Sequence, residues 1–123
     1  MFINDKKKLS EVQDEFNAIY PYLKIEFYSE SHDTNEGTTE ASQLDSELTI
    51  ESARTIHNKG ELKLDKDLKV GDLEHEFFEK YGLNVQVFRR SGDLWLQTTK
   101  TDQWTLEEQN ERGMAENEMK TFQ

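Results

Sequence analysis

Two segments of this chain, residues 9–28 and 70–89, carry the same order of apolar residues. In each segment the apolar positions are spaced by three, four and four residues, and then by two and two. The first spacing is that of one helix face and the second is that of one strand face. We therefore predict a helix followed by a strand in each segment. The matched residues are Leu9, Val12, Phe16, Tyr20, Leu23, Ile25 and Phe27, and then Val70, Leu73, Phe77, Tyr81, Leu83, Val85 and Val87.

The predicted helices have recognisable start and stop signals. Ser10 with Gln13 has the spacing of a capping box, and Gly71 with Glu74 is a weaker counterpart. Pro21 and Gly82 are expected to end the two helices. An ancient duplication explains the repeated pattern, and so do two similar solutions to one packing problem. The sequence leaves both explanations open.

The residues between the two segments have a different character. Residues 29–47 contain almost no large apolar side chain, and we expect a mobile acidic loop there. Residues 49–60 indicate a short helix with Ile50, Ala53 and either Ile56 or His57 on one side. Residues 61–65 indicate a short strand with Leu62 and Leu64 on one face.

Residues 84–100 are typical of a β-hairpin. With Ser91–Gly92 as the turn, one face carries the two valines and two leucines, and the other face carries Phe88 and Trp95. This register pairs Arg90 with Asp93, Arg89 with Leu94, Phe88 with Trp95, Val87 with Leu96, and Val85 with Thr98.

A last helix is predicted to begin at Thr105, because Thr105 and Glu108 form a capping box. We expect residues 114–123 to be a frayed tail. Together these elements predict one α+β domain over residues 1–123, in two layers. Its sheet is expected to be mostly antiparallel, with three to four strands, two repeated αβ units and a C-terminal helix. The expected strands are 22–29, 61–65, 84–90 and 93–100.

The charge of the chain limits its partners. The 123 residues carry 15 basic and 26 acidic side chains, a net charge of -11. Nucleic acids and anionic membranes would repel such a chain, so we expect neither as a partner. The chain has no cysteine and no apolar run long enough to span a bilayer. These features are typical of a cytoplasmic protein.

The sequence provides little support for catalysis. We find no phosphate-binding glycine loop, nucleophile elbow or zinc motif, and we predict no catalytic residue, cofactor or metal. Asp72, His75 and Glu79 share one predicted helix face and could hold a metal ion. A solvated acidic face explains them better. His57 is expected to act as a favourable charge at a helix end.

The aromatic face of the hairpin is the candidate site. Phe88 and Trp95 lie on it, Arg89 and Arg90 flank it, and Tyr28 occupies the corresponding face of its own strand. Aromatic and arginine side chains contribute most to the energy of protein interfaces. If exposed, this face predicts binding to another protein or to a second copy of the chain.

The same aromatic residues could instead be covered. The C-terminal segment, beginning with Trp104 and Leu106, is the apolar sequence left over for that purpose. Two functions therefore stay open. One is a non-enzymatic protein-interaction module that uses the aromatic and basic sheet face. The other is a small ligand-binding protein or enzyme with a pocket between sheet and helices, using His57, Asp72 or His75.

The stretch LEHEFFEKYGLNVQVFRRSGDLWLQTTKTDQWTLEEQN, residues 73–110, resembles part of a group of small acidic bacterial proteins without an assigned activity. The resemblance implies a bacterial cytosolic origin. It implies no activity, cofactor or site residue.

Overall fold

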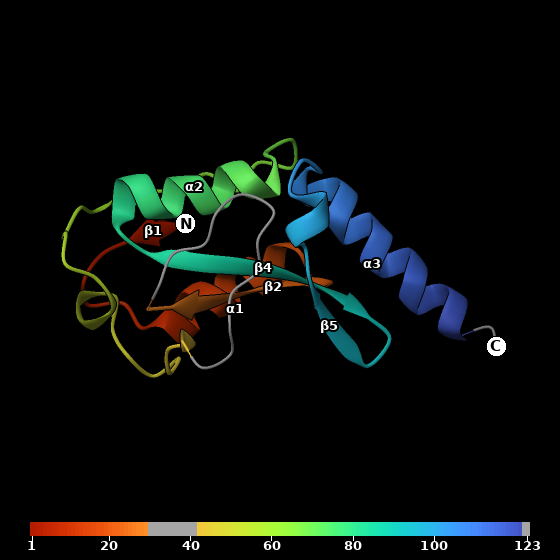
Figure 1. Cartoon of the computed structure of the whole chain (residues 1–123), viewed down its shortest axis with the longest axis horizontal. Coiled ribbons are helices and arrows are strands. Elements are labelled where there is room, and N and C mark those ends of the chain that lie inside the picture. Colours follow the sequence, from red (N-terminus) through yellow and green to blue (C-terminus); the bar gives the residue numbers. More distant parts are fainter. Residues whose placement is uncertain (30–41, 122–123) are drawn as a thin grey trace.

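Each of the two matching segments folds as a helix followed by a strand (Figure 1). Helix α1 (Leu9–Ile19) precedes strand β2 (Leu23–Tyr28), and helix α2 (Val70–Tyr81) precedes strand β4 (Asn84–Ser91). Strand β5 (Leu94–Gln97) and helix α3 (Leu106–Thr121) follow. The predicted α+β class and the C-terminal helix are confirmed.

This computed structural model describes residues 1–29 and 42–121, with side chains up to residue 117. Within these residues the main sheet has the order β2-β4-β5 and is antiparallel throughout. A second, two-stranded sheet pairs β1 (Phe2–Ile3) with β3 (Gly60–Glu61).

The register of β2 on β4 relates the two helix–strand units by an approximate two-fold axis. Ile25 pairs with Val87, and Phe27 pairs with Val85. In the sequence match Ile25 corresponds to Val85 and Phe27 to Val87, so exchanging the two units converts each pair into the other. The axis passes through the pair Glu26–Gln86. Both helices consequently lie on one face of the sheet, where their apolar sides form one core.

That core contains the apolar residues that the repeated spacing singles out. All of them are buried, and Ile3, Ile50, Leu62 and Leu106 join them from outside the two segments. The two helix–strand units thus follow from local apolar periodicity, and burial of their shared core holds them together.

The first N–H groups of α1 and α2 are bonded by backbone carbonyls from turns far away in the sequence. Leu9 N donates to Leu48 O at 2.9 Å, and Ser10 N donates to Ser46 O at 2.9 Å. In the second unit, Val70 N and Gly71 N donate to Trp104 O and Asp102 O, both at 2.9 Å. These contacts satisfy donors that a helix start leaves without an intrahelical partner.

Two turns supply these contacts, and two similar turns supply the reciprocal ones, to Ile50 N and Leu106 N. Each has a hydrogen bond from the fourth residue to the first, and each precedes a fully buried apolar residue. Two of the turns meet at the bridge Lys8–Thr49 and two at Lys69–Thr105. The turns begin at Asn4, Asp45, Asp65 and Thr101, and the buried residues are Leu9, Ile50, Val70 and Leu106.

The predicted starts of α1 and α2 are wrong by two residues, because the turns bond the first N–H groups of these helices; at α1, Lys8 N also donates to Glu11 Oε1 at 3.4 Å. The N-cap residues are Lys8 and Lys69, neither with a side-chain capping bond. Gln13 and Glu74, expected in capping boxes, instead reach the edges of the strands. The capping box predicted for the last helix is present: Thr105 N donates to Glu108 Oε1 at 3.0 Å, and Glu108 N donates to Thr105 Oγ1 at 3.1 Å.

The predicted helix over 49–60 is also wrong. Only Glu51–Ala53 forms a short 3-10 helix, and Arg54 then turns to an extended conformation. The buried guanidinium of Arg54 is drawn inward, where Nη1 donates to Tyr81 O at 3.0 Å. Ile56 is consequently left 42% exposed.

The strand predicted at 61–65 does not join the main sheet. Leu62 is buried, but its backbone pairs with the start of the chain: Leu62 N donates to Met1 O at 2.8 Å. This segment therefore pairs with the chain start in the separate two-stranded sheet.

The turn of the hairpin lies one residue later than predicted, so the pair that closes it is Ser91–Leu94 and not Arg90–Asp93. The turn is Gly92–Asp93, with Gly92 at φ 63°, and Ser91 pairs with Leu94. Glycine at the first loop position permits this left-handed conformation without steric cost. Because both strands shift together, every side chain keeps its predicted face.

Parts of two other predicted segments lie outside the described residues, namely 30–41 of the loop and 122–123 of the tail. The described end of the loop extends the sheet, since Gln43 bridges Tyr28 and Leu44 N donates to Phe27 O at 2.8 Å. Helix α3 continues to Thr121, through most of the segment expected to fray.

Lys8→Ser tests whether the turns already cap α1. A serine normally improves a helix start by about 1 kcal/mol over a residue that cannot cap. Here we expect the free energy of unfolding to change by less than about 0.5 kcal/mol, because the N–H groups are already bonded. Urea denaturation measures it. Thr105→Ala is the matched control and should cost about 1 kcal/mol. A clear gain in Lys8→Ser would contradict the assignment.

Candidate functional site

The β4–β5 hairpin carries exposed apolar side chains on an edge strand. Leu94 is 67% exposed and Leu96 is 40% exposed. They share the sheet face of the buried valines, but α1 packs on β2, α2 on β4, and α3 on β4 and β2. Strand β5 and α3 extend from the same end of the molecule, at the right of Figure 1. The sheet therefore reaches beyond its helical cover at β5.

The other face of the hairpin holds the aromatic residues. Phe88 pairs across the ladder with Gln97, and Trp95 pairs with Arg90, so the two rings are diagonal neighbours and not directly opposite. Both are half-buried. The ammonium group of Lys24 lies 5.3 Å from the Phe88 ring centre and 5.0 Å from that of Trp95. This is cation–π geometry, which holds the lysine against the rings.

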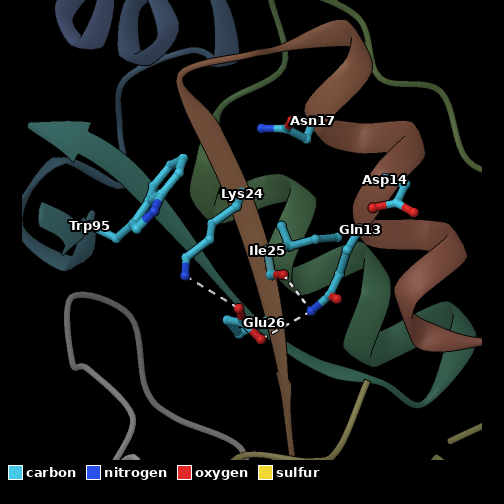
Figure 2. A pocket seen from close by; sticks show the side chains of 7 residues that line it. All are labelled: Gln13, Asp14, Asn17, Lys24, Ile25, Glu26 and Trp95. Atoms are coloured by element: carbon cyan, nitrogen blue, oxygen red, sulfur yellow. Dashed lines mark hydrogen bonds and ion pairs between the residues drawn. The ribbon is translucent and has the colours of Figure 1, made fainter. Parts of the chain in front are cut away.

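Lys24 also forms part of a shallow cleft along the outer edge of β2 (Figure 2). Its Nζ lies 3.4 Å from Glu26 Oε1. From α1, Gln13 Nε2 donates to Ile25 O at 2.9 Å and to Glu26 Oε2 at 3.0 Å. The cleft holds about 240 Å³, less than a typical small-molecule site. Its lining residues are Gln13, Asp14, Asn17, Lys24, Ile25, Glu26 and Trp95.

Side chains from the helices bond to the backbone along the edges of β2 and β4. Asn17 Nδ2 donates to Leu23 O at 2.9 Å, beside the Gln13 bond described above. On β4, Val87 N donates to the buried Glu74 carboxylate at 2.9 Å. These bonds occupy groups with which another strand would pair.

Arg89 belongs to the interface with α3, on the face opposite Phe88 and Trp95. Its Nη1 donates to Gln109 Oε1 at 2.8 Å, its Nη2 lies 3.5 Å from Glu116 Oε1, and its guanidinium carbon lies 5.8 Å from the Trp104 ring centre. Burial opposes ionisation of Glu116, yet bonds from Arg112 and Ser91 and the charge of Arg89 lower its pKa overall. Apart from Leu106, which is buried in the core, α3 is thus docked by polar contacts.

The other predicted site residues divide between the surface and the interior. Arg90 is exposed on the face of Phe88 and Trp95, with Nε donating to Gly92 O at 3.0 Å. Tyr28 is 2% exposed, so its ring is not available at the surface. Leu106 is buried in the core on the helix side, and Trp104 contacts Arg89. The start of α3 therefore does not cover the aromatic pair.

His57 forms an ion-pair cluster with Asp5 and the buried Arg54, and it does not lie at a helix end as expected. Its Nδ1 lies 2.9 Å from Asp5 Oδ2, while Arg54 Nη2 donates to Asp5 Oδ1 at 2.8 Å. The Arg54 hydrogen bond, followed by the contribution of His57, lowers the pKa of Asp5 below its ordinary 3.8 despite some desolvation. The cluster ties the N-terminal turn to the segment after Ile50.

Asp72, His75 and Glu79 are exposed on α2. Across residues 1–29 and 42–121, no group of three or more His, Asp or Glu side chains is placed to hold a metal ion. None of the helices in these residues is long and apolar enough to cross a membrane.

Comparisons with family models, curated proteins and solved structures find no match to this chain. The function must therefore be argued from the site.

Lys24→Ala tests the contact between the lysine and the aromatic pair. In a Trp104→Phe background, Trp95 is the remaining tryptophan. Removing the Lys24 side chain uncovers the Trp95 ring, so the acrylamide quenching constant of Trp95 fluorescence should rise. Lys63→Ala, at an exposed lysine of another segment, should leave quenching unchanged. Equal quenching in all three proteins would show that Lys24 does not cover Trp95.

Asp5→Asn tests the electrostatic cluster. A carboxyl whose pKa is lower in the folded state than in the unfolded state stabilises the fold at any pH above its unfolded-state pKa. That stability is lost as the pH falls through the folded-state pKa. We expect Asp5→Asn to lower the melting temperature at pH 7, and the difference to narrow below pH 3.8. Thermal denaturation followed by circular dichroism measures both. Asp67→Asn, at an exposed aspartate, is the control. A pH-independent difference would refute the electrostatic explanation.

Proposed function

We propose that this chain is a non-enzymatic protein-interaction module whose partner adds a strand to β5. The observation that carries this proposal is the pair Leu94 and Leu96, 67% and 40% exposed on one face of an edge strand. An edge strand with exposed apolar side chains is a template for pairing with another chain. Trp95 and Phe88 add aromatic area on the reverse face.

The local charge supports the same interpretation. Residues 84–100 contain three basic side chains and one acidic side chain, a net charge of +2 (3 − 1), whereas the whole chain carries -11. The basic residues are Arg89, Arg90 and Lys100, and the acidic one is Asp93. A negatively charged partner that approaches the hairpin therefore meets less repulsion there than at the rest of the acidic surface.

The alternative, a ligand-binding protein or enzyme with a pocket between sheet and helices, has less support. The described side chains in that space are fully or almost fully buried against each other. Asp72 and His75 are exposed on α2, and His57 is exposed in the segment that follows Ala53. The described cleft lies at the edge of β2, and its lining includes no histidine.

Charged substitutions on β5 test the proposal. Proteins retained by the tagged full-length chain are identified, purified and titrated against it by calorimetry. Leu94→Glu should weaken binding at least about tenfold, as expected for a central interface residue. Phe78→Glu is the matched control, because Phe78 is 46% exposed on α2, and it should bind as the unsubstituted chain does.

Circular dichroism and thermal melting must first show that both variants are folded. A purified partner that binds Leu94→Glu with unchanged affinity, or one that is lost only in Phe78→Glu, would place the interaction elsewhere and refute the proposal.

A further inference from the structure

The exposed part of β5 is symmetric about Trp95. The sequence around it is Leu–Trp–Leu, with both leucines on one face and the tryptophan on the other. When two identical strands pair antiparallel about a two-fold axis normal to the sheet, each residue meets one on its own face. A pairing centred on Trp95 therefore sets Leu94 of one copy opposite Leu96 of the other.

The hydrogen-bonding direction of β5 suits this pairing. Arg90 N donates to Tyr22 O, so the even-numbered residues of β4 bond toward β2. The odd-numbered residues bond toward β5, where Leu94 and Leu96 face them. By alternation, Trp95 directs its N–H and C=O toward the outer edge. In the described part of the chain no strand pairs with that edge.

We infer that the partner of β5 is a second copy of this chain, paired antiparallel with Trp95 opposite Trp95. This inference rests on the proposed function and names its partner. The pairing joins two three-stranded sheets into one six-stranded sheet. It gathers four leucines on one face and brings the two tryptophans together on the other. A second copy therefore contacts all the exposed apolar residues of the strand.

The charge of the chain sets the strength and the salt dependence of the dimer. Two copies at -11 each repel one another at long range, and salt screens that repulsion. An interface of one short strand is at the small end for protein pairs. We expect a weak dimer, and we expect it to become stronger as the salt concentration rises.

Analytical ultracentrifugation of the full-length chain, from about 10 µM to about 1 mM, measures the equilibrium. It should show a monomer–dimer equilibrium whose dissociation constant falls between low and high salt. The chain with Leu94→Lys and Leu96→Lys, and the chain with Leu94→Glu and Leu96→Glu, should each be monomeric. Their mixture should form a one-to-one dimer, because Lys then faces Glu across the new pairing. Phe78→Glu should dimerise as the unsubstituted chain does.

Cross-linking tests the register. Because the chain has no cysteine, Trp95→Cys introduces a single thiol. In a directly opposed pair the two Cα atoms lie about 5.5 Å apart, within disulfide range. Oxidation should give a covalent dimer from Trp95→Cys and little from Lys63→Cys, an exposed control.

A chain that stays monomeric at the highest concentration would overturn the inference. So would a dimer that persists in the doubly substituted lysine variant, or one that weakens with salt. The proposed function would still stand after any of these results, provided that a different protein binds the hairpin and binds Leu94→Glu more weakly. That function fails separately, when binding proves insensitive to the hairpin substitutions.

Discussion

The antiparallel ladder between β2 and β4 is the interaction on which the rest of the structure depends. It joins two helix–strand units that are distant in the sequence, and its register brings Ile25 beside Val87 and Phe27 beside Val85. This register turns the apolar faces of both units to the same side, whereas a slip of one residue would turn one of them outward. One core can then form from two short segments, in a chain in which only 33% of the residues are hydrophobic.

The sequence predicts the structure best where burial follows local periodicity. Both αβ units and the hairpin faces follow from spacings of three, four and two residues. The starts of α1 and α2 do not, because backbone carbonyls cap them and leave no side-chain signature. A spacing that recurs four times in the sequence could have revealed the turns. Asn4, Asp45, Asp65 and Thr101 each precede a buried apolar residue by five positions.

The candidate site was predictable in part for the same reason. Alternation along the strands is enough to place Phe88, Arg90 and Trp95 on one face. The surroundings of Arg89 depend on α3, which docks through polar contacts and a close approach at Gly113. A Cβ at Gly113 would come within 2.7 Å of Tyr22 Cβ. Such docking has no apolar stripe that sequence analysis could detect, and the burial of Tyr28 was equally hidden.

The edges of the main sheet differ in a way that bears on function. Along β2, Gln13 and Asn17 bond to carbonyl groups, and along β4 the Glu74 carboxylate accepts from Val87 N. These side chains obstruct pairing with another strand. Strand β5 has neither proline nor charge and displays two leucines outward instead. Among the described edges of the main sheet, β5 is the one that displays exposed apolar side chains, and the hairpin that carries it has a net charge of +2 (3 − 1). This combination is the reason for proposing β5 as a binding edge.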